Sequence, residues 1–174
     1  PLAATAQTYP SKPVRLIVPF APGGATDVIA RLTGQKLSDA LGQQFVIDNR
    51  PGANGNIGTE MAAKAQSDGY TLVMSYDGTL AINPSVYRNM PFDPQKDLAP
   101  VASVAQLPLL MVVNAGFAAK NVAEFVAYAK ANPGKVNFSG AGNGSAGHLA
   151  GELFRARAGI DLVHVNYKGG GQAV

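Results

Sequence analysis

The sequence predicts an α/β fold in which mostly parallel sheets carry helices on their faces. Short apolar runs rich in β-branched residues alternate along the chain with longer segments of helical periodicity. Glycine-rich stretches join several of these runs to the helical segment that follows. Strands and helices that alternate in this way form βαβ units, whose strands run parallel in one sheet.

The first part of the chain repeats the order strand, loop, helix. A β-branched run stops at Pro19, a glycine loop follows, and a helix can begin at Thr26 or Asp27 and continue to Gly42. A loop of Gly, Asn and Pro over 49–58 and a turn at Asp68-Gly69 separate the later elements. The predicted elements are strands over Val14–Val18, Phe45–Ile47 and Thr71–Met74, and helices over 26–42 and Thr59–Ala65.

The alternation breaks between Ile82 and Pro100. Prolines at 84, 91, 94 and 100 and a mixed composition predict a long surface connection there. We expect a lobe boundary after it, with a first lobe over residues 1–104 and a second over 105–174.

The second part returns to alternating strands and helices. Its predicted elements are strands over Val101–Gln106, Leu109–Val113, Val136–Phe138 and Leu162–Val165, and helices from Val122 to about Asn132 and over Ser145–Ala158. Residues 168–174 resemble a glycine loop that opens a further helix, which predicts a truncated chain; a disordered tail is the alternative.

Composition narrows the class of protein. The charge of +3 comes from 14 basic and 11 acidic residues spread without a basic block, so we expect no nucleic-acid partner. Apolar runs are too short for membrane insertion, and the absence of cysteine excludes disulfides and thiolate sites. Ala4-Thr5-Ala6 has the form of a signal-peptide cleavage site, which favours export; a disordered terminus is the alternative.

Glycine-rich loops that join a strand to a helix are the recurrent functional signal. Backbone N–H groups and helix N-termini in such loops favour an anion such as a carboxylate or phosphate. Several loops at the carboxyl ends of parallel strands face one crevice, although glycine in any single loop is more often a steric requirement. The loops span 20–26, 50–58, 139–147 and 168–172.

Two catalytic interpretations of residues 142–147 fail on position. The pattern G-x-G-x-x-G fits a dinucleotide fingerprint, but Asp161 precedes its strand and so lies at the wrong edge of the sheet. Ser145 lacks the first glycine of a nucleophile elbow, and His148 would lie beside it on one helix rather than across from it. Ser145 is therefore predicted as a helix cap or an anion ligand, and His148 as an anion donor or a partly buried helix residue.

Other polar residues keep two interpretations each. Asp27 and Asp77 follow strands and could bind an ammonium group of a ligand. Alternatively, Asp27 suits a helix N-cap and Asp77 suits a turn. Tyr9, Tyr76 and Tyr167 could line the crevice, or they could pack against neighbouring side chains. His148 and His164 lie on different elements, and no cluster has the spacing of metal ligands, so we expect neither metal nor cofactor.

A series of motifs runs in order along nearly the whole chain, at 9–13, 18–27, 30–31, 49–58, 68–72, 148–154 and 165–169. In these motifs the sequence resembles the substrate-binding receptors of tripartite tricarboxylate transporters, the Bug family. The resemblance implies a periplasmic-binding-protein-like, Venus-flytrap fold of two α/β lobes. It also implies a periplasmic, non-enzymatic receptor that closes on a small carboxylate and presents it to a membrane permease. Members of the family are considerably longer than this chain.

The resemblance also implies which loops hold the carboxylate, through backbone groups, hydroxyls and water. The first lobe would contribute Phe20, Ala21, Gly23, Gly24, Thr26, Asp27, Tyr76, Asp77 and Thr79. The second lobe would contribute Gly142, Gly144, Ser145, His148 and Tyr167. Arg31 is expected to be structural. The alternative from another class is a doubly wound enzyme that binds a nucleotide or phosphorylated substrate through the same loops.

Overall fold

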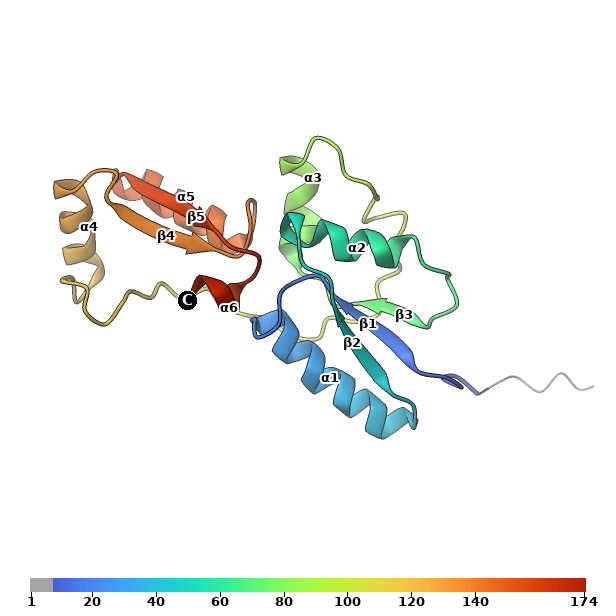
Figure 1. Ribbon diagram of the computed structural model, residues 1–174. Helices are drawn as coiled ribbons and strands as arrows, with labels where there is room; N and C mark the ends of the chain where they lie inside the picture. Colours follow the sequence, from blue (N-terminus) through green and yellow to red (C-terminus); the bar gives the residue numbers. More distant parts are fainter. Residues whose placement is uncertain (1–7) are drawn as a thin grey trace, which may run out of the picture.

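The computed structural model describes residues 8–174 and contains two separate parallel sheets (Figure 1). The first sheet has the order β2-β1-β3, and the second pairs β4 with β5. Both pairings with β1 are parallel, as is the pairing of β4 with β5. The predicted α/β class with parallel sheets is confirmed.

The first sheet is built around β1 (Val14–Val18), between β2 (Phe45–Asn49) and β3 (Thr71–Val73). Helix α1 (Ala25–Leu41) and helix α2 (Asn56–Ala63) lie on opposite faces of this sheet (Figure 1). The apolar cluster beneath α1 comprises Leu16, Val18 and Ala30, with Ile47, Leu72 and Met74 against it. Burial on both faces explains the apolar run Leu16–Val18 in the central strand.

The chain after β3 forms helix where the sequence predicts a plain connection from Ile82. A π-helical turn, η2 (Gly78–Ile82), continues into α3 (Asn83–Val86) before the surface loop begins. Pro84 does not prevent this, because it occupies the first turn of α3, where its missing N–H has no partner to lose. The prediction of a connection starting at Ile82 is wrong by about one helical turn.

The second sheet pairs β4 (Val136–Gly140) with β5 (Leu162–Asn166). Its helices are α4 (Val122–Ala131), α5 (Ala146–Ala158) and the short α6 (Gly170–Ala173). Ser145 caps α5 as predicted, by accepting a hydrogen bond from the backbone N–H of His148. The core between these elements comprises Ala119, Phe125, Ala129, Val136, Ile160 and Leu162.

The predicted strands over Val101–Gln106 and Leu109–Val113 do not form in the structure. Residues 99–114 lie outside both sheets, and no backbone hydrogen bond is recorded for residues 98–113. Their composition favours a strand, but a strand requires a neighbour to accept and donate its backbone hydrogen bonds. Leu110 and Val112 are consequently 80% and 69% exposed.

Candidate ligand-binding cleft

A cavity of about 210 Å³ lies between the two sheets, at the carboxyl ends of their strands. It is formed by the segments that follow β1, β2, β4 and β5, together with Tyr87 after α3. Open parallel sheets bind ligands at this edge. The lining residues are Phe20, Gly52, Ala53, Asn54, Gly55, Tyr87, Ala141, Gly142, Asn143, Asn166, Tyr167 and Lys168.

The backbone at Gly142 lies directly against Asn54 on the other side of the cleft. A Cβ placed on Gly142 would lie 2.9 Å from Asn54 Oδ1, and the φ of Gly142 is +143°. Both constraints exclude a side chain there. The Tyr87 hydroxyl also reaches across, donating a long hydrogen bond of 3.4 Å to the Asn143 carbonyl. The 142–144 turn is therefore held close to the first sheet.

Asn54 is the centre of a buried hydrogen-bond network that forms the floor of the cleft. Its amide donates to Asn83 Oδ1 at 2.7 Å and accepts from the Tyr76 hydroxyl, while its carbonyl accepts from Thr79 Oγ1 at 2.8 Å. Asn83 Nδ2 donates back to the Asn54 carbonyl and to Asn56 Oδ1. Asn54 adopts a left-handed conformation at φ +51°, which the network stabilises.

Tyr76 and Thr79 serve this network rather than line the cavity. Burial raises the pKa of Tyr76 far above its usual range, although the hydrogen bond to Asn54 opposes this effect. The phenol therefore remains a neutral donor. Its ring also meets Phe20 edge to face, with 4.9 Å between centroids, and Phe20 does line the cavity.

Asp27 holds the loop after β1 together from inside. Its carboxylate accepts hydrogen bonds from the Gly23 backbone N–H at 2.9 Å, Arg31 Nε at 3.0 Å and Asn49 Nδ2 at 2.9 Å. Burial by itself would raise the pKa of Asp27, but the bonds from Arg31, Gly23 and Asn49 outweigh it and lower the pKa. Arg31 is committed to this carboxylate, in keeping with its expected structural role.

The polar groups at the start of α5 are likewise satisfied by one another. Ser145 Oγ accepts from the His148 N–H at 3.2 Å, and the Gly144 N–H donates to His148 Nδ1 at 3.0 Å. Asp77 has a similar local role, since its side chain accepts from the Gly78 N–H at the start of η2. These residues shape the loops around the cleft.

Of the residues predicted to contact ligand, the cavity is lined by Phe20, Gly142 and Tyr167. Ala21, Gly23 and Gly24 instead lie against the backbone of residues 169–171, which close over them from the far end of the chain. Thr26 and the remaining predicted residues lie outside the lining.

Sequence reasoning did not single out the individual residues that contribute most of the lining. Asn54, Tyr87, Asn143, Asn166 and Lys168 line the cavity without having been predicted. For Asn54, Asn143 and Lys168 the signal was the set of glycine loops itself, because these residues lie within three of the four predicted loops. Tyr87 and Asn166 lie outside those loops.

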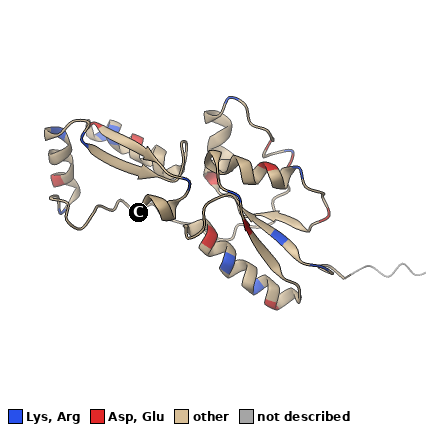
Figure 2. Ribbon diagram, viewed as in Figure 1, with Lys and Arg blue, Asp and Glu red and all other residues tan. Residues whose placement is uncertain are grey.

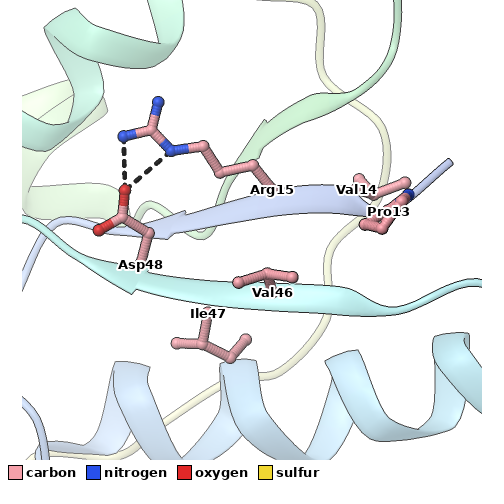
Figure 3. A pocket seen from close by; sticks show the side chains of 6 residues that line it. All are labelled: Pro13, Val14, Arg15, Val46, Ile47 and Asp48. Carbon is pink, nitrogen blue, oxygen red and sulfur yellow. Dashed lines mark hydrogen bonds and ion pairs between the residues drawn. The ribbon is translucent and has the colours of Figure 1, made fainter.

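A larger and more open hollow of about 380 Å³ lies beside the amino end of β1 and along β2 (Figure 3). Arg15 crosses it to donate hydrogen bonds to Asp48, and Ile47 points away toward α1 (Figure 3). No glycine loop reaches this surface, which lies away from the carboxyl ends of the strands. The smaller cavity is therefore the better candidate for ligand binding.

Other classes of site find little support in residues 8–174. Lys and Arg are interspersed with Asp and Glu on helices α1, α4 and α5, and strands β4 and β5 carry none of these four residue types (Figure 2). Within the described residues, no group of three or more acidic or histidine side chains could hold a metal ion. No helix of that part of the chain is both long and apolar enough to cross a membrane.

Comparison with known proteins gives consistent matches over almost the whole chain. The profile of the tripartite tricarboxylate transporter family receptor matches residues 29–174. Protein BugT of Bordetella pertussis is 43% identical, and the match covers 98% of this chain and 52% of the length of BugT. A relative from the tcbD-tcbE intergenic region of Pseudomonas sp. is 42% identical, and the match covers 95% of this chain and 49% of the length of that relative. The chain thus spans about half the length of these curated relatives.

Solved structures give the same result. Rhodopseudomonas palustris Rpa4515 with adipate is 42% identical, with a TM-score of 0.90 over 92% of this chain and 54% of that one. MatC from the same organism, with bound malate, is 32% identical, with a TM-score of 0.87 over 95% of this chain and 56% of that one.

Proposed function

Because this chain belongs to the receptor family of the tripartite tricarboxylate transporters, we propose that it captures a small carboxylate between two lobes for delivery to a membrane permease. The proposed ligand class covers dicarboxylates, tricarboxylates, acidic amino acids and aromatic acids. The structural relatives that hold adipate and malate support a carboxylate ligand. The family consists of solute-binding receptors, so the alternative of a nucleotide-binding enzyme is set aside.

The observation that carries the proposal is the composition of the cleft. Backbone from the glycine loops and the amides of Asn143 and Asn166 supply neutral donors, and Lys168 adds positive charge. Free N–H groups at the ends of parallel strands favour anions, and water can bridge the remaining gaps. A carboxylate matches this set of donors.

The proposal assigns the two sheets to two lobes that meet at the cleft, with the boundary between residues 104 and 105. Phe20, Gly142 and Tyr167 would contact the ligand directly. The other predicted residues would act by fixing the loops, as Asp27 and Ser145 do through their hydrogen bonds. Ligand binding would draw the lobes together around the anion.

The family implies a periplasmic location. We propose that the protein is exported with removal of a signal peptide and that it works with permease subunits. The predicted cleavage site at Ala4-Thr5-Ala6 lies outside the residues that the structure describes.

A ligand screen with matched glycine variants tests the proposal. Thermal unfolding of the natural polypeptide that carries this chain would be followed with mono-, di- and tricarboxylates, acidic amino acids, NAD and ATP. A carboxylate at about 100 times its Kd should stabilise the protein by about 2.7 kcal/mol. Stabilisation by nucleotides alone, or by none of these compounds, would contradict the proposal.

Gly142→Ala should abolish the stabilisation by ligand, because the new methyl group would collide with Asn54 Oδ1 at the lining of the cleft. Gly147→Ala is the control, since a Cβ at Gly147 meets nothing within 4 Å. Equal ligand shifts in both variants would show that binding does not involve the 142–144 turn.

A further inference from the structure

We propose that Lys168 makes this receptor selective for ligands with a second carboxylate group. The inference rests on the proposed function, because it assigns one residue of that cleft to the second charge of the ligand. Two ends of a dicarboxylate require two anion-binding positions. The loops with backbone and amide donors provide one of them, and Lys168 provides the other.

The charge balance of the cleft supports this assignment. Of its lining residues, Lys168 carries the sole ionised side chain, and the others are neutral. Within residues 8–174, no carboxylate is recorded within ion-pair distance of its ammonium group. Lys168 thus brings to the lining of the cleft a positive charge that no recorded ion pair within residues 8–174 neutralises.

The other basic side chains near the loops are already engaged. Arg31 binds the Asp27 carboxylate, and Arg50 donates to Asp48 at 2.8 Å. Neither of them lines the cavity. A second carboxylate in the cleft would therefore find its charged partner at Lys168.

The main chain beneath Lys168 is fixed from both sides. The Tyr167 N–H donates to the Gly140 carbonyl at 2.9 Å, which ties the end of β5 to β4. On the other side, a Cβ placed on Gly169 would lie 3.3 Å from the backbone nitrogen of Ala21, after β1. Lys168 therefore projects from a point where both sheets meet, while its flexible stem can follow ligands of different length.

The expected effect is moderate, because Lys168 is solvent-exposed and water screens its charge. We expect a contribution of about three- to tenfold in Kd for a dicarboxylate. A monocarboxylate of the same chain length should gain almost nothing from the lysine. The difference between the two ligands isolates the charge contact from any general effect on the cleft.

The test is calorimetric titration of the natural polypeptide with paired probes, succinate against butyrate and adipate against hexanoate. For whichever dicarboxylate binds, Lys168→Gln should raise the Kd by about three- to tenfold, and it should change the Kd of the matched monocarboxylate by less than about twofold. It should also reduce the salt dependence of dicarboxylate binding. Lys168→Arg should retain most of the preference. Lys135→Gln, at an exposed lysine outside the cleft, should change nothing.

Two results would overturn the role of Lys168. One is equal weakening of both ligands of a pair by Lys168→Gln, which would indicate a structural role, and the other is no weakening of either. A wild-type protein that binds monocarboxylates as tightly as dicarboxylates would also refute the selectivity while leaving the receptor function intact. Binding of no carboxylate at all would instead be a failure of the proposed function.

Discussion

The imidazole rings of His148 and His164 stack on each other, with 3.9 Å between their centroids and 16° between their planes. His164 lies on β5 and His148 in the first turn of α5, so the fold brings together two residues that the sequence places on different elements. The Nε2 atom of His164 is buried without a hydrogen-bond partner. The pair lies behind the 140–144 turn of the cleft, where His164 faces Gly140 and His148 accepts from Gly144.

This arrangement predicts a loss of stability in mild acid. Burial, and then the proximity of His148, lower the pKa of His164, while Glu152 acts weakly in the opposite direction. The unfolded chain, whose imidazole has a pKa near 6.5, therefore binds a proton before the folded chain does. Stability should be complete above about pH 6.5 and fall as pH decreases below it, which urea unfolding between pH 7.5 and pH 5 would measure.

The variant His164→Asn lacks the titrating ring and should show a flatter profile over the same range. The carboxylates of Asp27, which is buried, and Asp48, which is partly buried, do not affect this comparison. The pKa of Asp27 and that of Asp48 are lowered from 3.8, so the stability that they contribute is lost only in stronger acid. An unchanged loss between pH 7.5 and pH 5 in the variant would assign the effect to other groups.

Two substitutions at Asn54 should separate its hydrogen bonds from its backbone conformation. Asn54→Gly removes the side-chain bonds to Asn83 and Tyr76 and should lower the free energy of unfolding by about 2–4 kcal/mol. Asn54→Ala loses the same bonds and also places a Cβ at φ +51°, which should add about 1 kcal/mol. Urea unfolding of both variants gives the two contributions, and an alanine variant as stable as the glycine variant would argue against backbone strain.

Helix α2 approaches β1 at a glycine, and this contact should not tolerate a methyl group. A Cβ at Gly58 would lie 2.8 Å from both Pro19 Cα and the Arg50 carbonyl oxygen. Gly58→Ala should therefore destabilise the protein by about 1–3 kcal/mol. In contrast, Gly147→Ala adds a methyl group to an open helix position and should stabilise by up to about 1 kcal/mol. Melting temperatures that shift in the same direction would contradict this reading.

Removing the charge of Asp27 should loosen the loop after β1. The Asp27 carboxylate accepts hydrogen bonds from the Gly23 N–H, Arg31 and Asn49. In Asp27→Asn an NH2 group replaces one carboxylate oxygen, so at least one of these donors would face another donor. We expect a loss of at least about 2 kcal/mol in the free energy of unfolding. The Arg31 side chain is half exposed, so water can replace part of its lost hydrogen bond. Arg31→Ala should be milder for the same reason, and equal losses in the two variants would indicate that the ion pair dominates.

The sequence predicted well the parts of the fold that depend on local pattern. β1, α1, α5 and β5 lie within a few residues of the positions that periodicity and glycine indicate, because each pattern is complete within its own segment. The strands expected over 101–113 failed because pairing depends on a neighbour that a local pattern does not specify.

The same limit applied to the cleft. The glycine loops indicated which edge of the sheets could bind an anion. The contact of Gly142 with Asn54, and the use of Asp27 and Ser145 for internal hydrogen bonds, arise from distances between segments far apart in sequence. No local pattern contains those distances.

The central position of β1 has a consequence for the order of folding. Both of its neighbours, β2 and β3, are made after it, and β3 ends at Val73. During synthesis, the apolar residues Val14, Ile17 and Val18, which are fully buried in the finished sheet, stay exposed until these later strands have been made. Pairing over such separations is slow, because the chain between the strands must close before contacts form. The first sheet can therefore be completed only after the chain has been made through Val73, and until then one edge of β1 stays unpaired.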